Sequence, residues 1–137
     1  MSRPFPLEIL TPEYQFFAGE VEALTITGVE GELTVLCGHT PMIAPLTVGT
    51  IQIKQDGAWR AAFQSEGFLE VDSEGAHLFV QACEWPETID VRRAEESRRK
   101  AQEKLRQSQN MIEYHASQMS LARAMMRLRI TRQSRGY

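Results

Sequence analysis

The sequence has 137 residues, of which 42% are hydrophobic and 24% are charged, and its formal net charge is −3. A chain of this length can bury one modest core, or form a small domain with an appendage, and its apolar runs are too short to cross a bilayer as helices. No secretory signal pattern opens the sequence, so we expect the protein to stay in the compartment in which it is made.

The first half of the chain has the pattern of short strands separated by turns. Ile51 and Ile53 alternate with polar residues, Asp56-Gly57 follows, and the alternation then resumes, which predicts a β-hairpin whose two central turn residues have positive φ. Turn signals recur about every eight to twelve residues, as in antiparallel sandwiches and barrels. The expected strands cover residues 7–10, 16–28, 32–37, 42–46, 51–54, 59–63, 68–71 and 76–82.

The second half has the pattern of two helices. Pro86 ends the last strand, and Asp90 is placed as the N-cap of a helix that extends to about Gln107. Residues 108–110 form a turn in which Asn110 tolerates the left-handed conformation of a helix end. A second helix is expected at residues 112–130, followed by a frayed end.

We therefore predict an α+β fold, with an antiparallel β-sandwich in residues 1–86 and an antiparallel two-helix hairpin in residues 87–137. The apolar stripe of the first helix is narrow and consists of Ala94, Ala101 and Leu105. Such a stripe buries little area, because each methylene contributes only about 0.8 kcal/mol, and isolated helices of this length are marginal in water. We expect a mobile hairpin with docked and undocked states.

Charge divides the chain at Asp90. The residues before it include three cations and thirteen anions, a net charge of −10, whereas Asp90 and the residues after it include twelve cations and five anions, a net charge of +7. Pairs such as Glu95–Arg99 and Glu96–Lys100 neutralise part of the basic half. The asymmetry favours docking of the second half on an acidic surface, its own or a partner's.

The residues that usually carry catalysis have no catalytic spacing here. Cys37 and Cys83 lie far apart and outside any CxxC motif, so we expect two free, buried thiols. His39, His77 and His115 have no metal-ligand or triad spacing. No glycine-rich phosphate loop is present. We predict no catalytic residue and no metal site.

The spacing of four cations is compatible with an anion site. Arg93 and Lys100 lie seven residues apart on one face of the first helix, and Arg123 and Arg127 lie four apart on one face of the second. Arginine forks suit a polyphosphate. If both faces converge where the hairpin meets the sandwich, the four side chains surround one pocket.

Two other classes of function remain open from the residues alone. One is a free-standing β-sandwich interaction module whose helices form an intermolecular coiled coil. The other is a small nucleic-acid-binding regulator, since twelve cations on a helical hairpin are compatible with phosphate contacts. The acidity of the whole chain argues against nucleic acid, and we predict none as a partner.

Four motifs in order resemble the epsilon subunit of the F-type ATP synthase, over nearly the whole chain. The match consists of Gly31-Glu32-Leu33 followed by Gly38-His39-x-Pro41, then Gly67-Phe68-Leu69-Glu70-Val71, Ile89-Asp90-x-x-Arg93-Ala94, and Ala122-Arg123-Ala124-Met125-Met126-Arg127-Leu128.

This resemblance implies a non-catalytic subunit of the rotating central stalk of a proton-translocating complex. It implies that the sandwich attaches to the gamma subunit and the c-ring, with His39 in a turn near the gamma contact. It further implies that the hairpin can extend toward the alpha and beta subunits and inhibit ATP hydrolysis. The implied location is peripheral, on the cytoplasmic face of the bacterial plasma membrane.

The resemblance also implies regulatory ATP, with or without Mg, held by the Ile/Leu-Asp-x-x-Arg-Ala motif, and no required cofactor. Lysine stands at position 100 where the nucleotide-binding pattern has arginine, so the charge is kept and the bidentate fork is lost. Carried over residue by residue, the site comprises Glu84, Ile89, Asp90, Arg93, Ala94, Lys100, Arg123 and Arg127.

Overall fold

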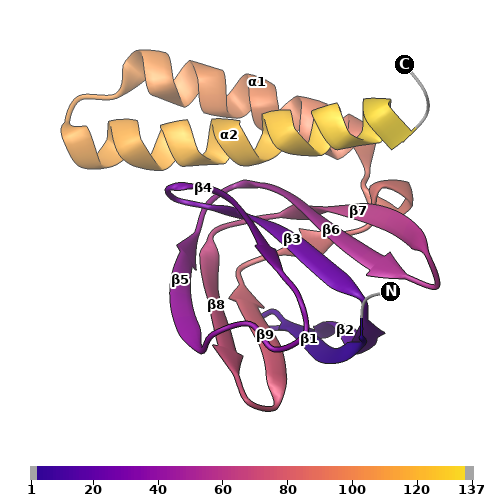
Figure 1. Ribbon diagram of the computed structural model, residues 1–137. Coiled ribbons are helices and arrows are strands. Elements are labelled where there is room, and N and C mark those ends of the chain that lie inside the picture. The colour runs from indigo at the N-terminus through magenta and orange to yellow at the C-terminus, as the bar shows by residue number, and fades with distance from the viewer. Residues whose placement is uncertain (1–2, 135–137) are drawn as a thin grey trace. The chain divides into compact units, whose positions relative to one another are not determined.

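The computed structural model describes residues 3–134, and its contacts divide the chain into two compact units (Figure 1). The first unit runs through Glu84 and contains every strand. The second begins at Trp85 and contains the helices. The predicted α+β fold, a β-sandwich followed by a two-helix hairpin, is confirmed.

The first unit is built from ten strands that form one continuous hydrogen-bonded sheet. The strands are β1 (Phe5–Leu10), β2 (Gln15–Val21), β3 (Ala23–Gly28), β4 (Gly31–Val35), β5 (Met42–Leu46), β6 (Gly49–Gln55), β7 (Ala58–Gln64), β8 (Gly67–Asp72), β9 (Gly75–Val80) and β10 (Cys83–Glu84).

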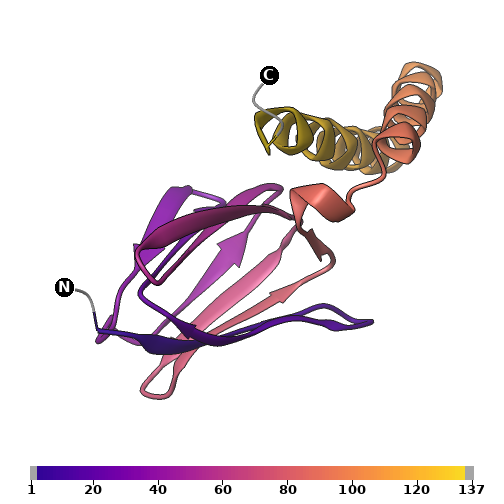
Figure 2. The ribbon, with the colours of Figure 1, turned by 90° about the vertical axis from the view of Figure 1, so that its right-hand side faces the viewer.

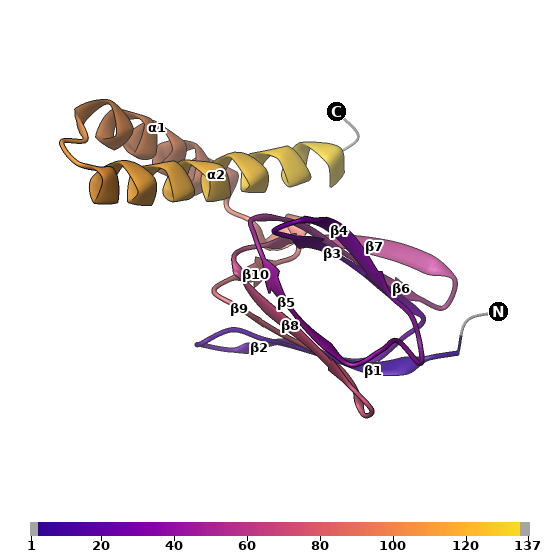
Figure 3. The same ribbon diagram turned by 60° about the vertical axis from the view of Figure 1, so that its left-hand side comes forward.

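The sheet folds over itself between β3 and β5. Its order is β10-β7-β6-β3-β5-β8-β9-β1-β2, with β4 paired to β3. A single residue pair, Gly28↔Leu46, joins β3 to β5, so the sheet bends there and gives two layers. Figure 3 shows these layers facing each other across the core. Apolar side chains at alternate positions point into this core, including Ile9, Leu24, Ile51 and Leu78.

Most strand pairs are antiparallel as predicted, but β1 and β9 pair in parallel, from Leu7↔Ala76 to Leu10↔Phe79. The strand expected over residues 16–28 is also wrong in detail, because it divides at Glu22 into β2 and β3. The backbone N–H of Glu22 donates to the Lys54 carbonyl at 2.8 Å, and Glu22 Oε1 accepts from the Gly57 N–H at 2.7 Å. These bonds tie the break in the strand to the tip of the β6–β7 hairpin.

That hairpin has the turn that the sequence predicts. Asp56 has a φ of 50° and Gly57 a φ of 78°, so both central residues adopt the left-handed conformation. This backbone twist matches the right-handed twist of the flanking strands. The register from Gly49↔Gln64 to Gln55↔Ala58 follows from it.

A buried glutamine of β7 joins β3 to the connection between β5 and β6. The side-chain amide of Gln64, which has no exposed surface, donates to the carbonyls of Thr27 at 2.8 Å and Thr47 at 2.6 Å. Its Oε1 accepts from the Thr27 N–H at 3.3 Å. The polar atoms of this side chain are therefore satisfied inside an apolar core, as burial requires.

The expectation of two buried thiols is half wrong. Both cysteines are free, but Cys83 is buried and Cys37 is exposed. The predicted strand 32–37 ends at Val35, so Cys37 lies in the loop beyond β4 and not in the core.

The second unit consists of a short 3₁₀ helix, η1 (Pro86–Thr88), followed by α1 (Val91–Gln107) and α2 (Met111–Ser134). Figure 2 shows the two long helices side by side. The predicted limits of the first helix are confirmed. The second helix begins one residue earlier than predicted and continues to Ser134, so the expected fraying from Thr131 is wrong over the described residues; residues 135–137 lie outside them.

The turn between the helices differs from the prediction. Asn110 does not adopt a left-handed conformation. Instead, its Oδ1 accepts from the Glu113 N–H at 2.9 Å, and the Glu113 carboxylate accepts from the Gln109 N–H at 3.0 Å. These two bonds cap the start of α2, so Asn110 belongs to the second helix and not to the end of the first. No helix within residues 3–134 is long and apolar enough to span a membrane.

Candidate functional site

The predicted nucleotide motif lies at the start of α1. Asp90 is the N-cap, as predicted, and its Oδ1 accepts from the Arg93 N–H at 3.1 Å. Ile89 and Ala94 are buried, whereas Arg93 and Asp90 are exposed. The motif therefore combines two buried apolar side chains with two polar residues that face solvent, and one of these, Asp90, also caps the helix.

Small buried side chains form the seam between α1 and α2. Ala94 and Ala101 are 4% and 3% exposed, and Ala124 and Ser117 are 1% and 7% exposed. Ala94 and Ala124 are equally distant from Gln109 in the connecting turn, as are Ala101 and Ser117. In an antiparallel hairpin these residues lie opposite each other, so the helices meet mainly through small side chains.

The four predicted cations lie along one rim of the hairpin. Because each helical residue turns by about 100°, Arg93 and Lys100 flank the alanine seam on the side away from Arg98. By the same geometry, Arg123 and Arg127 flank Ala124 on the side away from Met125 and Arg129.

A groove on the other rim joins Arg98 to Met125 and Arg129, so the four cations share the opposite rim. We call this set, Arg93, Lys100, Arg123 and Arg127, the basic rim.

The basic rim combines exposed and half-buried cations. Arg93 and Lys100 are exposed, and Arg123 and Arg127 are half-buried. Arg123 Nη2 donates to Ser120 Oγ at 3.3 Å. Glu84, the remaining residue of the predicted set, ends β10 and belongs to the sandwich unit. The hairpin alone thus supplies four positive charges and the Asp90 carboxylate.

The ion pairs along α1 differ from those predicted. Glu95 pairs with Arg98, whose Nε donates to Glu95 Oε1 at 2.8 Å, and Glu96 lies 3.7 Å from Arg92. Glu96 thus pairs with Arg92 and not, as predicted, with Lys100, which belongs to the basic rim. The Arg98 guanidinium lowers the pKa of the Glu95 carboxyl, with smaller contributions from Arg99 and Arg132.

The opposite rim contains a groove of about 750 Å³, which we call the methionine groove. It includes none of the predicted nucleotide residues. The sequence did not predict this groove, although the spacing of Ala122, Met126 and Arg129 places these residues on one helical face. Its lining residues are Glu95, Arg98, Ala122, Met125, Met126, Leu128, Arg129, Arg132 and Gln133.

His39 lies in the exposed loop after β4, in the turn that the sequence predicts. Its backbone N–H donates to the Leu36 carbonyl at 3.1 Å, and its Nδ1 lies 2.9 Å from the Thr40 carbonyl oxygen. A hollow of about 360 Å³ lies between this loop and the β8–β9 turn at Ser73 and Glu74. The loop thus forms one end of the sandwich.

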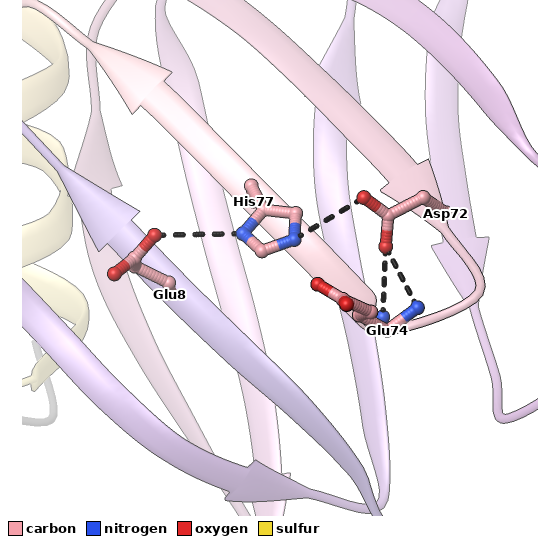
Figure 4. A network of polar contacts seen from close by, with 5 residues as sticks. Glu8, Asp72, Glu74 and His77 are labelled. Carbon is pink, nitrogen blue, oxygen red and sulfur yellow. Dashed lines mark hydrogen bonds and ion pairs between the residues drawn. The ribbon is translucent and has the colours of Figure 1, made fainter.

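His77 lies on β9 and contacts two carboxylates of the sandwich. Its Nδ1 lies 3.4 Å from Glu8 Oε1, and its Nε2 lies 3.6 Å from Asp72 Oδ2 (Figure 4). The second oxygen of Asp72 accepts from the N–H groups of Glu74 and Gly75, at 2.8 and 3.1 Å. This network joins the parallel strands β1 and β9 to the β8–β9 turn. Within residues 3–134, no cluster of His, Cys, Asp and Glu is suited to hold a metal ion.

Two family models together match nearly the whole chain. The model described as the β-sandwich domain of the ATP synthase delta/epsilon chain matches residues 4–86, and the long α-helix domain of the same chain matches residues 87–132. The ATP synthase epsilon chain of Caldanaerobacter subterraneus subsp. tengcongensis is 44% identical over 131 residues, which cover 95% of each chain. The chain belongs to the ATP synthase epsilon-chain family. The resemblance inferred from the motifs is thereby confirmed.

Another epsilon chain, from Alkaliphilus oremlandii, is 43% identical over 109 residues, covering 80% of this chain and 81% of the relative. Solved structures share the fold at lower identity. A chain of the Euglena gracilis mitochondrial ATP synthase has a TM-score of 0.75 and 22% identity, over 90% of this chain and 78% of its own. A Tetrahymena thermophila chain has a TM-score of 0.69 and 11% identity, over 95% and 98%.

Membership of the epsilon family makes this chain a non-catalytic subunit of ATP synthase, as predicted. ATP synthesis and proton transport are activities of the complex. The chain itself therefore acts by binding other molecules. The candidate binding surfaces among the predicted residues are the basic rim of the hairpin and the loop end of the sandwich.

Proposed function

We propose that this epsilon-family chain is a central-stalk subunit that couples the catalytic head of the F-type ATP synthase to the c-ring. The observation that carries this proposal is the match to the epsilon family from residue 4 to residue 132. The Tetrahymena neighbour, a chain from the central stalk and c-ring assembly of a mitochondrial ATP synthase, has the same fold. The complex, and the chain with it, lies at the cytoplasmic face of the bacterial plasma membrane, where the chain is peripheral.

The sandwich is the part that binds the gamma subunit and the c-ring. The neighbouring strands β5 and β8 carry exposed apolar side chains: Ile43 is 73% exposed and Phe68 is 44% exposed. Phe68 stacks on Phe79, with 4.9 Å between ring centroids. Contiguous exposed apolar side chains on one face favour a protein partner. His39 lies in the loop at the end of the sandwich, which suits the contact with the gamma subunit.

The hairpin is an inhibitor of ATP hydrolysis when it extends toward the alpha and beta subunits. The alanine seam supports this role, because two helices joined mainly by Ala94, Ala101, Ala124 and Ser117 separate at a small loss of buried apolar area. The net charge of +7 after residue 89 favours an acidic surface in the extended state.

Regulatory ATP favours the compact hairpin by binding the basic rim. Arg93, Lys100, Arg123 and Arg127 suit the phosphates, and Ile89, Asp90 and Ala94 of the same unit belong to the motif beside them. A ligand shifts an equilibrium only as far as its affinities for the two states differ. The basic rim contains residues of both helices, so it exists only while they lie side by side.

The inhibitory role is tested with a chain truncated before Asp90 and assembled into the whole complex. All strand pairs end at Glu84, so the truncated chain keeps the sandwich intact. ATP hydrolysis by the complex should rise several-fold relative to the full chain, while assembly is unchanged. Unchanged hydrolysis in a fully assembled complex would contradict inhibition by the hairpin without affecting the stalk assignment.

The nucleotide role is tested by calorimetry of the full chain with ATP, with and without Mg. Asp90→Ala and Arg93→Ala should each weaken binding at least tenfold, and Lys100→Arg should strengthen it by restoring the bidentate fork. Arg92→Ala, at a 91% exposed side chain outside the basic rim, is the matched control. No heat with millimolar ATP would contradict the sensor role.

A further inference from the structure

The methionine groove has the size of a small-molecule site. Its volume of about 750 Å³ lies within the range of roughly 300–1,000 Å³ that ligand pockets occupy. It follows α2 from Ala122 to Gln133, a length of about 16 Å at 1.5 Å per residue. It lies on the rim opposite the basic rim, so it is distinct from the proposed nucleotide site.

The floor of the groove is apolar and adaptable. Met125 is 52% exposed although it is a large apolar side chain, and Met126 is half-buried beside it. Methionine is unbranched and polarizable, so such a floor adjusts to a flexible chain better than to a rigid ring. The elongated shape and the two methionines together favour an acyl chain.

The charged end of the groove favours an anion. Arg129 and Arg132 are exposed, one turn apart on α2, and Arg98, which lines the same groove from α1, is already held by Glu95 and Gln102. Glu95 lies close enough to Arg132 for its pKa to be lowered by that charge. Within residues 3–134, Arg129 has no ion-pair partner. Arg98 balances the charge of the Glu95 carboxylate, so Arg129 and Arg132 leave a net positive charge in the groove.

We propose that the methionine groove binds a free fatty acid anion, with its carboxylate on Arg129 and Arg132 and its acyl chain along Met125 and Met126. A guanidinium fork matches a carboxylate in geometry and charge. The apolar floor accommodates a single chain, which fits one groove along one helix.

This ligand stabilises the closed hairpin. Glu95 and Arg98 come from α1, and the remaining lining residues come from α2, so the groove is lost when the helices separate. The fatty acid therefore favours the closed form by mass action. Relief of inhibition in the complex would follow from this and rests on the proposed function, whereas binding to the isolated chain does not.

The test uses the full chain with methyl-labelled methionine, titrated with dodecanoate below its micelle concentration. The expected result is saturable shifts of the Met125 and Met126 methyl signals, with Met42 of the sandwich and Met111 at the hairpin turn unmoved. Affinity should rise with chain length from octanoate to dodecanoate, by up to about fourfold for each added methylene that becomes buried. Amide exchange along both helices should slow on binding.

Variants separate the head group from the tail. The double variant Arg129→Gln, Arg132→Gln should weaken dodecanoate binding at least tenfold, and Arg92→Gln should change it less than twofold. Equal binding of dodecanol, or of inorganic phosphate, would overturn the proposal, since it requires both parts of the ligand. Absence of saturable shifts would overturn it as well, as would binding of an acidic amphipathic peptide in place of dodecanoate.

Discussion

The carboxylate of Asp90 accepts a hydrogen bond from the backbone N–H of Arg93, with 3.1 Å between Oδ1 and the nitrogen. These two residues also belong to the proposed nucleotide site. Asp90 therefore caps the helix whether or not a ligand is bound. A loss of ATP binding in Asp90→Ala could come from the lost cap or from the lost carboxylate charge. The two are separable by the choice of substitution.

Asp90→Ala removes the cap and should lower the stability of the hairpin by about 1 kcal/mol. Asp90→Asn keeps a capping oxygen and removes only the charge, so its stability should stay close to that of the parent chain. Thermal unfolding followed by circular dichroism measures both. If Asp90→Asn binds ATP as weakly as Asp90→Ala, the carboxylate charge and not the cap is what the nucleotide needs.

The seam between the helices predicts the effect of a larger side chain. Ala101 is 3% exposed, so Ala101→Leu should push α1 away from α2 and destabilise the hairpin by about 1–3 kcal/mol. The matched control is Lys104→Leu, at an exposed position on the same helix. Proteolysis measures the effect, and cleavage within residues 91–134 should accelerate only for Ala101→Leu. Equal rates would argue against close packing at the seam.

The pair Glu95–Arg98 predicts a change in helix stability at acid pH. The Arg98 guanidinium lowers the pKa of Glu95 from its ordinary value of 4.5. Since the folded pKa lies below the unfolded one, the stabilisation is fully present above pH 4.5 and is lost as the pH falls through the folded value.

Carboxyl NMR of Glu95 measures this titration directly. Arg98→Gln should move the midpoint up toward 4.5, and Arg106→Gln, which removes the partner of Glu103, should leave it unchanged. If the titration midpoint of the Glu95 carboxyl is the same in Arg98→Gln as in the parent chain, the ion pair does not persist in solution.

The two thiols should differ in reactivity by orders of magnitude. Burial, together with the charge of Glu84, raises the pKa of Cys83, so its reactive thiolate is scarce, whereas Cys37 is exposed. A chromogenic disulfide reagent should label one thiol quickly in the native chain and the second only on unfolding. Cys37→Ser should abolish the fast phase, and a fast phase that survives this substitution would mean that the sandwich opens around Cys83.

The buried amide of Gln64 predicts a large stability effect in the sandwich. Gln64→Met keeps the volume but removes the amide donor to the carbonyls of Thr27 and Thr47, and the Thr27 carbonyl then keeps the Thr47 N–H, at 3.2 Å. The free energy of unfolding should fall by about 2–4 kcal/mol. Gln52→Met, at an exposed position of β6, should change it by less than about 0.5 kcal/mol. Urea unfolding of both variants makes the comparison.

Local signals in the sequence predicted the elements that depend on local chemistry. The Asp56-Gly57 turn and the Asp90 cap follow from backbone and side-chain preferences at single positions, and both are as expected. Asn110 was misplaced because the same residue suits both the end of one helix and the start of the next. The choice depends on Glu113, whose carboxylate completes the cap.

The candidate surfaces were predictable only in part. The spacing of Arg93 with Lys100, and of Arg123 with Arg127, defines a face on each helix, but which faces meet depends on how the hairpin closes. The methionine groove was missed for this reason, since Arg98 and Arg129 come from different helices and their proximity is a tertiary property. Likewise, Cys37 is exposed because β4 ends two residues before it.

The parallel pairing of β1 with β9 has a consequence for how the protein is made. The strand Phe5–Leu10 is synthesised well before its parallel partner Gly75–Val80, and contacts of such long sequence separation form slowly. The helices emerge after both partners are present. All strands of the sandwich have therefore been synthesised before the hairpin is complete, so the sandwich can fold while the helices are still emerging.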